Sequence, residues 1–258
     1  MRIFKADLHV HSVLSPCGDL EMSPARIVEE AARKKIDILG IADHNSTLHG
    51  PLIKRLAAEK GIFVLCGAEV TTKEETHCLA FFEDLEKLGI FQQYLEDHLP
   101  DIANNPRYFG YQVVVDENGL ILEQIDKLLI SALDQTIEQL EEKVHGLGGL
   151  FIPAHIDRPS YSLISQLGFV PPGLRADAFE VSRLTTPADM VKKFPYLEGR
   201  SFIGGSDAHQ PEQIGSRKTL MLIQEAGFEE IRLALKGEGG RTVMIEPGHG
   251  RSNEVSRN

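Results

Sequence analysis

The sequence predicts an α/β protein, built either as a barrel or as a doubly wound sheet. Short apolar segments alternate with helical ones along 258 residues, a length at which α/β barrels commonly form one domain. Each apolar segment is brief and mostly rich in Ile, Val, Leu or Phe, a pattern typical of strands buried on both faces in a parallel sheet. We expect strands at 3–8, 36–41, 62–68, 78–82, 150–153, 177–181, 201–204 and 219–223.

Two of the intervening helices carry clear boundary signals. The first follows Ser23, whose hydroxyl can cap it, and has Pro24 in its first turn. Its apolar face is formed by Ile27, Val28, Ala31 and Ala32. The second begins near Thr136, with Gln139 in capping-box spacing, and ends at Gly146.

The stretch 84–134 interrupts the alternation of strands and helices. It contains Asn104-Asn105-Pro106 and the turn signal Asp116-Glu117-Asn118-Gly119. We interpret it as a helical and hairpin insertion packed on a barrel domain that spans 1–246. The remaining residues, 247–258, are polar and contain glycine, and they are predicted to form a flexible tail.

The composition bears on partners and on compartment. The net charge of −11 opposes binding to a long nucleic-acid duplex, because such binding depends on Lys and Arg displacing counterions from phosphates. The longest apolar runs are too short to span a membrane, and the first residues show no secretory signal. Three cysteines, an odd number, argue against a disulfide framework. We therefore expect a cytoplasmic protein without a membrane partner.

Histidine and acidic residues gather where the predicted strands end. His9 and His11 follow the first strand, and residues two apart in a strand point the same way, so both can reach one ion. Later strands carry similar residues at one end. His77 stands at the start of its strand, and the others stand at or just past a strand end: His44, Glu69, His155, Asp207 and His209. In a parallel barrel the carboxyl ends of the strands form the functional face. Imidazole and carboxylate together suit Zn, Mn or Fe, and a carboxylate such as Glu69 can bridge two ions.

The combination of these motifs is what indicates a metal centre. A single His-x-His or Asp-x-His motif carries little weight, because core and surface histidines account for most of them. Cys66 and Cys78 lie within predicted strands and are interpreted as core residues. The remaining histidines lack a strand-end placement and are interpreted as surface or structural residues: His49, His98, His145 and His249.

In combination and in order, the motifs resemble those of the PHP family, named for polymerase and histidinol phosphatase, from Asp7 to about Lys236. The resemblance implies a distorted seven-stranded β/α barrel with two or three divalent metal ions. It assigns the first ion to His9, His11, Glu69 and Asp207. It assigns the second ion to Glu69, His77 and His155, with Glu69 bridging. A third ion is assigned to His44 and His209.

The third site needs one more ligand from the loop after His11, and there the sequence departs from the family pattern. Many members have Ser-Asp-Gly in this loop, whereas this chain has Ser15-Pro16-Cys17-Gly18-Asp19. Ungapped spacing points to Cys17, and the usual chemistry points to Asp19. Thiolate is a good zinc ligand, whereas carboxylate suits Mn or Mg better. Both residues stay candidates, and we favour Asp19.

The residues and the resemblance together predict hydrolysis of a phosphomonoester or a small phosphodiester by metal-activated water. Arg158 and Arg183 lie just past strand ends, and their guanidinium groups match the geometry of phosphate. We expect both to bind substrate and Arg158 also to assist catalysis. Asp207 or His209 is a candidate for passing a proton to the leaving group. The expected substrate is a phosphorylated metabolite, a nucleotide or a short oligonucleotide end.

Two other functions are compatible with these residues. An amidohydrolase-type barrel also places His-x-His after its first strand, usually together with a carboxylated Lys or a Glu that bridges the metals. Here Lys73 follows Glu69 but is not at a strand end, which favours the phosphoesterase. The third possibility is a metal-stabilised interaction module without catalysis. Loss of ligands would indicate such a module, and this chain keeps essentially all of them.

Overall fold

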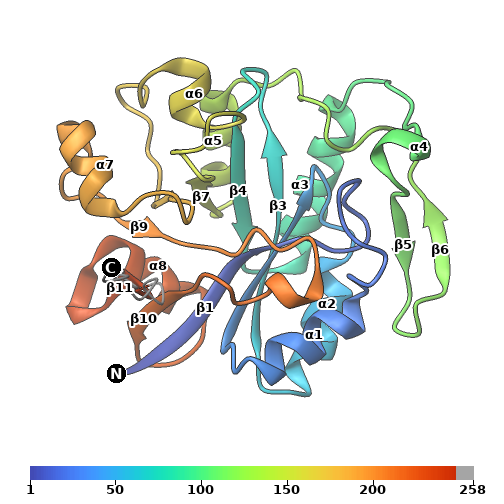
Figure 1. Ribbon diagram of the computed structural model, residues 1–258, viewed down its shortest axis with the longest axis horizontal. Coiled ribbons are helices and arrows are strands. Elements are labelled where there is room, and N and C mark those ends of the chain that lie inside the picture. Colours follow the sequence, from blue (N-terminus) through green and yellow to red (C-terminus); the bar gives the residue numbers. More distant parts are fainter. Residues whose placement is uncertain (248–258) are drawn as a thin grey trace, which may run out of the picture.

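The computed structural model describes residues 1–247, which fold around a curled seven-stranded sheet (Figure 1). This sheet contains β1 (Arg2–Val10), β2 (Ile38–His44), β3 (Phe63–Thr71), β4 (His77–Phe82), β7 (Leu150–Pro153), β10 (Thr219–Ile223) and β11 (Thr242–Ile245). The strand order is β11-β10-β1-β2-β3-β4-β7. The distorted seven-stranded α/β barrel that was predicted is thereby confirmed. The predicted flexible tail lies, from residue 248 onward, outside the described residues.

The expectation of a parallel sheet is wrong for most of the strand pairs. Strands β1, β2 and β3 are parallel neighbours. The pairs β3–β4, β4–β7, β1–β10 and β10–β11 are antiparallel. The reason for β3–β4 is the short connection 72–76, in which Thr72 N donates to the Thr76 carbonyl at 2.9 Å. A parallel crossover requires a dozen or more residues, so a connection of this length closes a hairpin.

The central strands are buried on both faces, as predicted. Side chains that point into the barrel, such as Phe4 and Leu8, share one apolar cluster with Phe228 and Ile231 of α8 (Phe228–Lys236). Helix α8 follows β10, whose last residue, Ile223, pairs with the first residue of β1. It therefore lies toward the amino end of β1, away from the carboxyl end where the candidate ligands stand.

The opposite face of the sheet is covered by helices. These are α1 (Pro24–Arg33), α2 (Gly50–Ala58), α3 (Leu85–His98), α5 (Ile137–Gly146), α6 (Leu163–Leu167) and α7 (Pro187–Lys193). The two predicted helix starts are confirmed. Ser23 accepts a hydrogen bond from Arg26 N, and Thr136 forms a capping box with Gln139. Such caps contribute about 1 kcal/mol each. Within residues 1–247, no helix is long and apolar enough to cross a membrane.

Two short parallel strands close the remaining side of the barrel. They are β8 (Phe179–Glu180) and β9 (Phe202–Ile203). In the barrel, β8 lies next to β7. Backbone hydrogen bonds join the two segments: Asp177 N donates to the Phe151 carbonyl, and Ile156 N donates to the Glu180 carbonyl. On the far side, the loop after β9 pairs with the end of β1 through a bridge between Val10 and Ala208. The closure brings the segments after β7 and β9 to the same end of the barrel as the segment after β1.

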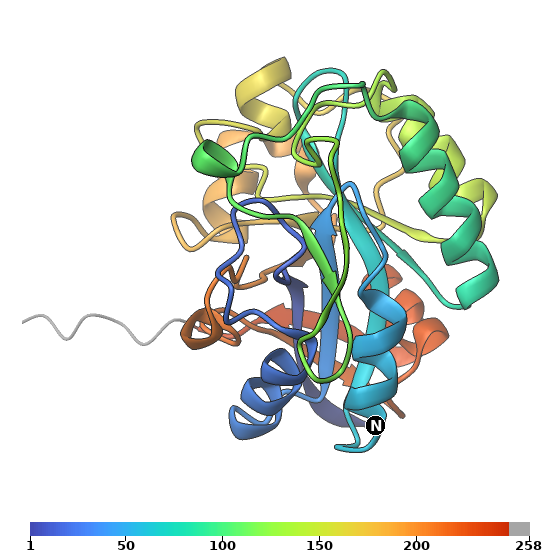
Figure 2. The same cartoon turned by 90° about the vertical axis from the view of Figure 1, so that its right-hand side faces the viewer.

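The segment 84–134 contains the predicted helical and hairpin elements. Helix α3 packs into the same apolar cluster as the other outer helices, through Leu88, Phe91 and Leu95. The part beyond it carries α4 (Pro106–Phe109) and the hairpin of β5 (Val113–Val115) and β6 (Ile121–Gln124), which stands in front in Figure 2. The hairpin closes at the predicted Asp116–Gly119 turn. The hairpin was predicted without the bounds of its strands, and β11 was not predicted.

Candidate metal centre and its cavity

A β-bulge in β1 aims the first two histidines into the barrel. Leu8 points inward, so regular alternation would turn His9 outward. The pairing of β1 with β2 shifts register within 7–10, and this bulge allows His9 and His11 to face inward together. Gly40 gives the bulge room, because a Cβ at that position would lie 2.5 Å from the Leu8 carbonyl oxygen.

Glu69, at the end of β3, is the centre of the cluster. Its side chain is 1% exposed and is surrounded by imidazole rings from five histidines. Their nitrogens lie near its carboxylate oxygens at 3.3 Å (His9), 3.4 Å (His11), 3.1 Å (His44), 3.0 Å (His77) and 3.0 Å (His155). A single buried carboxylate that faces so many imidazoles has the placement of a group that bridges two ions.

Three of these histidines reach Glu69 by different routes. His44 ends β2, which is parallel to β3. His77 begins β4, and because β4 runs antiparallel to β3, its start lies at the same edge as the end of β3. His155 follows β7 and has a positive φ of 30°. A non-glycine residue in that region is strained, and such strain is common where a side chain must be aimed at a site.

Asp207 joins the cluster from the loop after β9. Its Oδ1 lies 3.4 Å from His9 Nε2 and 3.2 Å from His11 Nε2. The Nε2 atoms of these two histidines are themselves 3.1 Å apart. Asp207 also has a positive φ, 51°, and its Oδ2 pairs with Arg158 at 2.5 Å. Ligand-type atoms of His9, His11, Glu69 and Asp207 all lie within 4.8 Å of one another, which is close enough for one ion.

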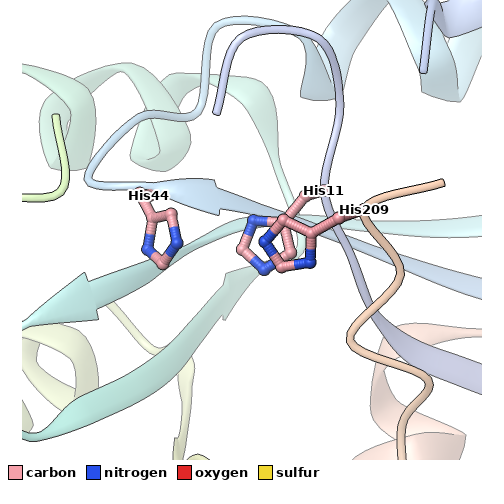
Figure 3. Close-up of side chains that lie close together, drawn as sticks. All are labelled: His11, His44 and His209. Carbon is pink, nitrogen blue, oxygen red and sulfur yellow. The ribbon is translucent and has the colours of Figure 1, made fainter. Parts of the chain in front are cut away.

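Two further groups of ligand-type atoms meet the same distance criterion. One is His44, Glu69 and His77. The other is His11, His44 and His209, whose rings face one another across the end of the barrel (Figure 3). The rings of His11 and His209 are stacked with centroids 4.2 Å apart. The structure thus brings together eight of the predicted ligands, and their assignment to particular ions stays a prediction.

The donor atoms of the cluster fit divalent metal ions. His44 Nδ1, His77 Nε2 and His155 Nδ1 are buried and have no hydrogen-bond partner among residues 1–247. His44 Nδ1 lies near Glu69, but it does so without hydrogen-bond geometry. A buried ring nitrogen without a partner is costly, and an ion is one partner that would satisfy it. Imidazole and carboxylate donors are those that Zn, Mn and Fe accept.

The charges of the cluster also suit ion binding. Burial lowers the pKa of His44 well below its ordinary value, and it lowers the pKa of His209 to about 4. Burial raises the pKa of Glu69, but His77, His9 and His44 outweigh it and hold that pKa well below its ordinary value. Neutral imidazoles beside ionised carboxylates are the protonation states in which these groups bind metals, and His44 and His209 meet that condition. Burial lowers the pKa of His9, but Glu180, Glu69 and Asp207 outweigh it and hold that pKa well above its ordinary value, so His9 would give up a proton on binding an ion.

Three buried acidic residues that were not predicted as site residues form hydrogen bonds that hold the candidate ligands in place: Glu180, Asp7 and Asp43. Glu180 accepts a hydrogen bond from His9 Nδ1 at 3.0 Å and one from His155 N at 2.9 Å. When Nδ1 carries the proton, Nε2 of His9 presents its lone pair to the cluster. Asp7 accepts hydrogen bonds from the backbone of Ser206 and Gly215, which fixes the turn that carries Asp207. Burial raises the pKa of Asp7 despite these bonds.

Asp43 supports His11 through the hydroxyl group of Ser15. Its carboxylate accepts from Ser12 N and Ser12 Oγ at 2.6 and 2.7 Å, and from Ser15 Oγ at 2.7 Å. Ser15 Oγ lies 3.0 Å from His11 Nδ1. Asp7 and Asp43 stand beside motif histidines, and Glu180 is the next-to-last residue of the predicted strand 177–181. An acidic residue near the end of a predicted strand, as at Glu69, is a signal that would have pointed to Glu180.

A cavity of about 970 Å³ opens beside the cluster. One part of its wall is formed by His155, Asp207 and His209. The predicted substrate residues Arg158 and Arg183 line the same cavity. The structure therefore places both arginines next to the candidate metal centre, with Arg158 in direct contact with Asp207.

The family model of the PHP domain matches residues 7–147, more than half of the chain. The chain belongs to the PHP family. The match begins at Asp7, within β1, and runs past β4, so it contains five of the eight clustered ligands: His9, His11, His44, Glu69 and His77. A PHP barrel with an intact set of histidine and acidic side chains accounts for the cluster described above.

Individual relatives extend the similarity to almost the whole chain. The uncharacterized protein YqxK of Bacillus subtilis is 29% identical over 285 aligned positions, which cover 96% of this chain and 66% of YqxK. The lesion-specific endonuclease Q of Pyrococcus furiosus shares the fold with a TM-score of 0.71 at 23% identity, over 94% of this chain and 58% of that one. This PHP chain thus spans about two thirds or less of the length of these relatives.

Two other solved structures bear on the alternatives. Endonuclease Q has been crystallised with a 27-mer duplex that carries an abasic lesion at the active site. The expectation that a long duplex is no partner of this PHP chain is therefore unsupported, because a protein of the same fold takes one. An amidohydrolase of Chromobacterium violaceum shares the fold with a TM-score of 0.54 at 21% identity, over 81% of this chain and 89% of that one.

The loop that departs from the PHP pattern separates the two candidates for the third site. Asp19 is exposed, and its Oδ1 accepts a hydrogen bond from Glu21 N within the same loop. Cys17 is exposed as well, but it lines the cavity beside His209. Burial and the carboxylates Glu69 and Asp207 raise the pKa of Cys17 to about 12. Neither side chain belongs to the three groups of close ligand atoms, so the third site is completed by neither residue and both stay candidates.

The histidines outside the PHP motifs have structural contacts. His49 is buried, lies 2.6 Å from Ser12 Oγ and accepts a hydrogen bond from Val115 N, so it ties the hairpin to the loop after β1. His98 pairs with Asp134. His145 lies between Glu141 and Asp177 at 3.1 and 3.0 Å. His249 lies outside the described residues. Cys66 and Cys78 are buried.

Proposed function

We propose that this protein is a metal-dependent phosphoester hydrolase that acts on a phosphomonoester or a small phosphodiester. The observation that carries the proposal is the shared cavity: candidate metal ligands form one part of its wall, and Arg158 and Arg183 form another. Membership of the PHP family supports a metal-dependent hydrolase. Arg158, in contact with Asp207, favours phosphate as the reacting group, because a planar guanidinium donates two parallel hydrogen bonds to it.

The cluster offers places for two ions and an incomplete place for a third. His9, His11, Glu69 and Asp207 would hold the first ion, and Glu69, His77 and His155 the second. His11, His44 and His209 are close enough together to share a further one. Bound divalent ions would supply activation of water near neutral pH and neutralisation of charge on phosphate oxygens. The identity and number of the ions are part of the proposal.

The chain's own residues orient the substrate. Arg158, held at the cavity wall by Asp207, still has guanidinium N–H groups with which to meet a phosphate oxygen. His209 Nδ1 lies 3.0 Å from the Asp207 carbonyl, so it can donate its proton there and leave Nε2 for the cluster. That arrangement supports His209 as a ligand. The ionised Asp207 carboxylate, whose pKa is held low by His9 and His11 against the effect of burial, has no proton to give to a leaving group.

A nucleic-acid phosphodiester is the second candidate substrate. Its support is the fold shared with endonuclease Q, which has been crystallised with a duplex substrate. The net charge of −11 counts against extended contact with a duplex, but a site with bound cations can take a chain end or a displaced nucleotide. The amidohydrolase-type reaction is the third candidate, supported by the fold alone.

A substrate panel with defined metals tests these candidates. The purified protein is freed of metal, loaded with Mn²⁺ or Zn²⁺, and offered phosphomonoesters, phosphodiesters, nicked and abasic duplexes, and amides. We expect metal-dependent turnover of a phosphoester, abolished in His9→Ala and retained in His98→Ala, whose side chain lies outside the cluster. Turnover of amides alone would overturn the proposal. Metal-induced stabilisation without turnover of any substrate would indicate the interaction module.

A further inference from the structure

The cavity beside the metal centre is lined by more cations than one phosphate requires. They are Arg158, Arg183, Arg217 and Lys218. Arg158 is paired with Asp207, and Lys218 with Glu246 at 2.8 Å. Within residues 1–247, neither Arg183 nor Arg217 has a carboxylate oxygen within 4.0 Å of its guanidinium nitrogens. Two guanidinium groups thus line the cavity without an ion-pair partner in the described part of the chain.

Arg217 is built into the cavity wall. Its side chain passes over Gly204 at the end of β9, where a Cβ would lie 2.6 Å from Arg217 Nε and 3.1 Å from its Cγ. Its Nη2 reaches the carbonyl of Thr185 at 3.4 Å, two residues after Arg183. The guanidinium of Arg217 therefore lies against the loop that carries Arg183.

The polar atoms of Arg217 are not fully used by the protein. Its Nε is buried and has no hydrogen-bond partner among the described residues. Burial lowers the pKa of Arg217, while Asp157 and Glu180 act against that effect. The oxygens of these two acids accept from other donors: Asp157 from Ser182 N and Oγ, and Glu180 from His9 and His155. These two acids stabilise the positive charge of Arg217 but accept no hydrogen bond from its N–H groups.

The end of β9 separates this arginine from the metal centre. A Cβ on Gly204 would meet Arg217, whereas a Cβ on the next residue, Gly205, would meet Glu180 and His9. Two adjacent glycines thus mark the boundary between the ligand cluster and the arginine pair. A cavity of about 970 Å³ is larger than a single phosphate needs, and small-molecule sites commonly span about 300–1,000 Å³.

We propose that Arg183 and Arg217 form a subsite for a second anionic group of the substrate, apart from the phosphoester that reacts beside Arg158. The inference rests on the proposed function and names its substrate class, a molecule with two phosphate groups. The second phosphate has two sources with the same chemistry. It belongs either to a bisphosphorylated small molecule or to the neighbouring nucleotide of an oligonucleotide.

Substrate preference tests the subsite. KM is measured for fructose 1,6-bisphosphate against fructose 6-phosphate, and for the dinucleotide pTpT against thymidine 5′-monophosphate. In Arg217→Gln, we expect the loss for the two-phosphate compound to exceed that for its one-phosphate partner by about 10-fold or more, the factor typical of one charge-assisted contact. Arg183→Gln should behave alike. Arg107→Gln, an exposed arginine outside the cavity, makes the same change of charge as a control.

Binding separates the subsite from the reaction. Calorimetric titration of the metal-free protein with pyrophosphate and with inorganic phosphate needs no turnover. Weaker pyrophosphate binding in Arg217→Gln than in Arg107→Gln supports the subsite even if no phosphoester is hydrolysed. The sugar and dinucleotide pairs tell the two sources apart. Equal losses for one-phosphate and two-phosphate compounds, or no loss in folded Arg217→Gln and Arg183→Gln, would overturn the inference.

Discussion

Replacing Glu180 with glutamine is expected to weaken metal binding without removing any ligand. The wild-type carboxylate accepts from His9 Nδ1 at 3.0 and 3.2 Å and from His155 N at 2.9 Å. Glutamine has nearly the same shape, but its amide nitrogen cannot accept. With the amide oxygen in the Oε2 position both donors keep an acceptor, but that oxygen carries no charge and is a weaker acceptor. The amide NH₂ in the Oε1 position then faces the Nδ1–H of His9 at 3.2 Å, and both His9 and His155 are candidate ligands. The substitution therefore loosens the rings that the cluster depends on.

The size of the effect follows from what such supporting groups contribute elsewhere. Loss of a hydrogen-bonding partner behind a metal-ligating histidine typically costs about 10–100-fold in affinity, or about 1.4–2.8 kcal/mol. Competition with a fluorescent chelator measures Mn²⁺ and Zn²⁺ affinity directly. Glu141→Gln is the matched control, because Glu141 is also buried and bonded, to His145 and Arg175, away from the cluster. Unchanged affinity in Glu180→Gln, or an equal loss in the control, would refute this reasoning.

Three further predictions use the same protein. Arg158→Ala should raise KM for a phosphoester more than it lowers metal content, because the Arg158 guanidinium meets Asp207 Oδ2 at the cavity wall. Steady-state kinetics combined with metal analysis checks this prediction. Loss of metal at constant KM would contradict it. Cys17→Ser should alter the preference between Zn²⁺ and Mn²⁺, and Asp19→Ala should not, because Cys17 lines the cavity while Asp19 accepts a hydrogen bond within its own loop. Metal titrations of both variants check this prediction. The reverse result would identify Asp19 as the ligand. Asp177 and Glu141 raise the pKa of His145, so the stability it contributes is present below its unfolded pKa and lost as pH rises through the folded one. His145→Gln should then lower the free energy of unfolding by about 0.5–1 kcal/mol at pH 5.5 and by less at pH 9.5, as measured in urea; an equal loss at both values would rule out the ion pair.

The sequence by itself determined the elements and most of the candidate ligands. Strand and helix periods and capping residues are local, so they showed where β7 ends and where α1 and α5 begin, and they placed the ends of β2 and β3 three residues early, at 41 and 68. Ligand-type residues at those ends, His44, Glu69 and His155 among them, therefore pointed to one edge of a barrel. His77 reaches that edge although it begins its strand, because the five-residue connection from β3 makes β4 antiparallel.

Only the tertiary structure decided how these side chains are aimed and supported. The bulge that turns His9 inward depends on a register shift against β2 and on room above Gly40. Glu180 supports His9 from 171 residues away, and Arg217 enters the cavity by passing over Gly204. A local pattern records the face on which a residue lies, but not which distant group meets it there. That pairing follows from chain closure and packing, which bring segments far apart in the sequence to the same end of the barrel.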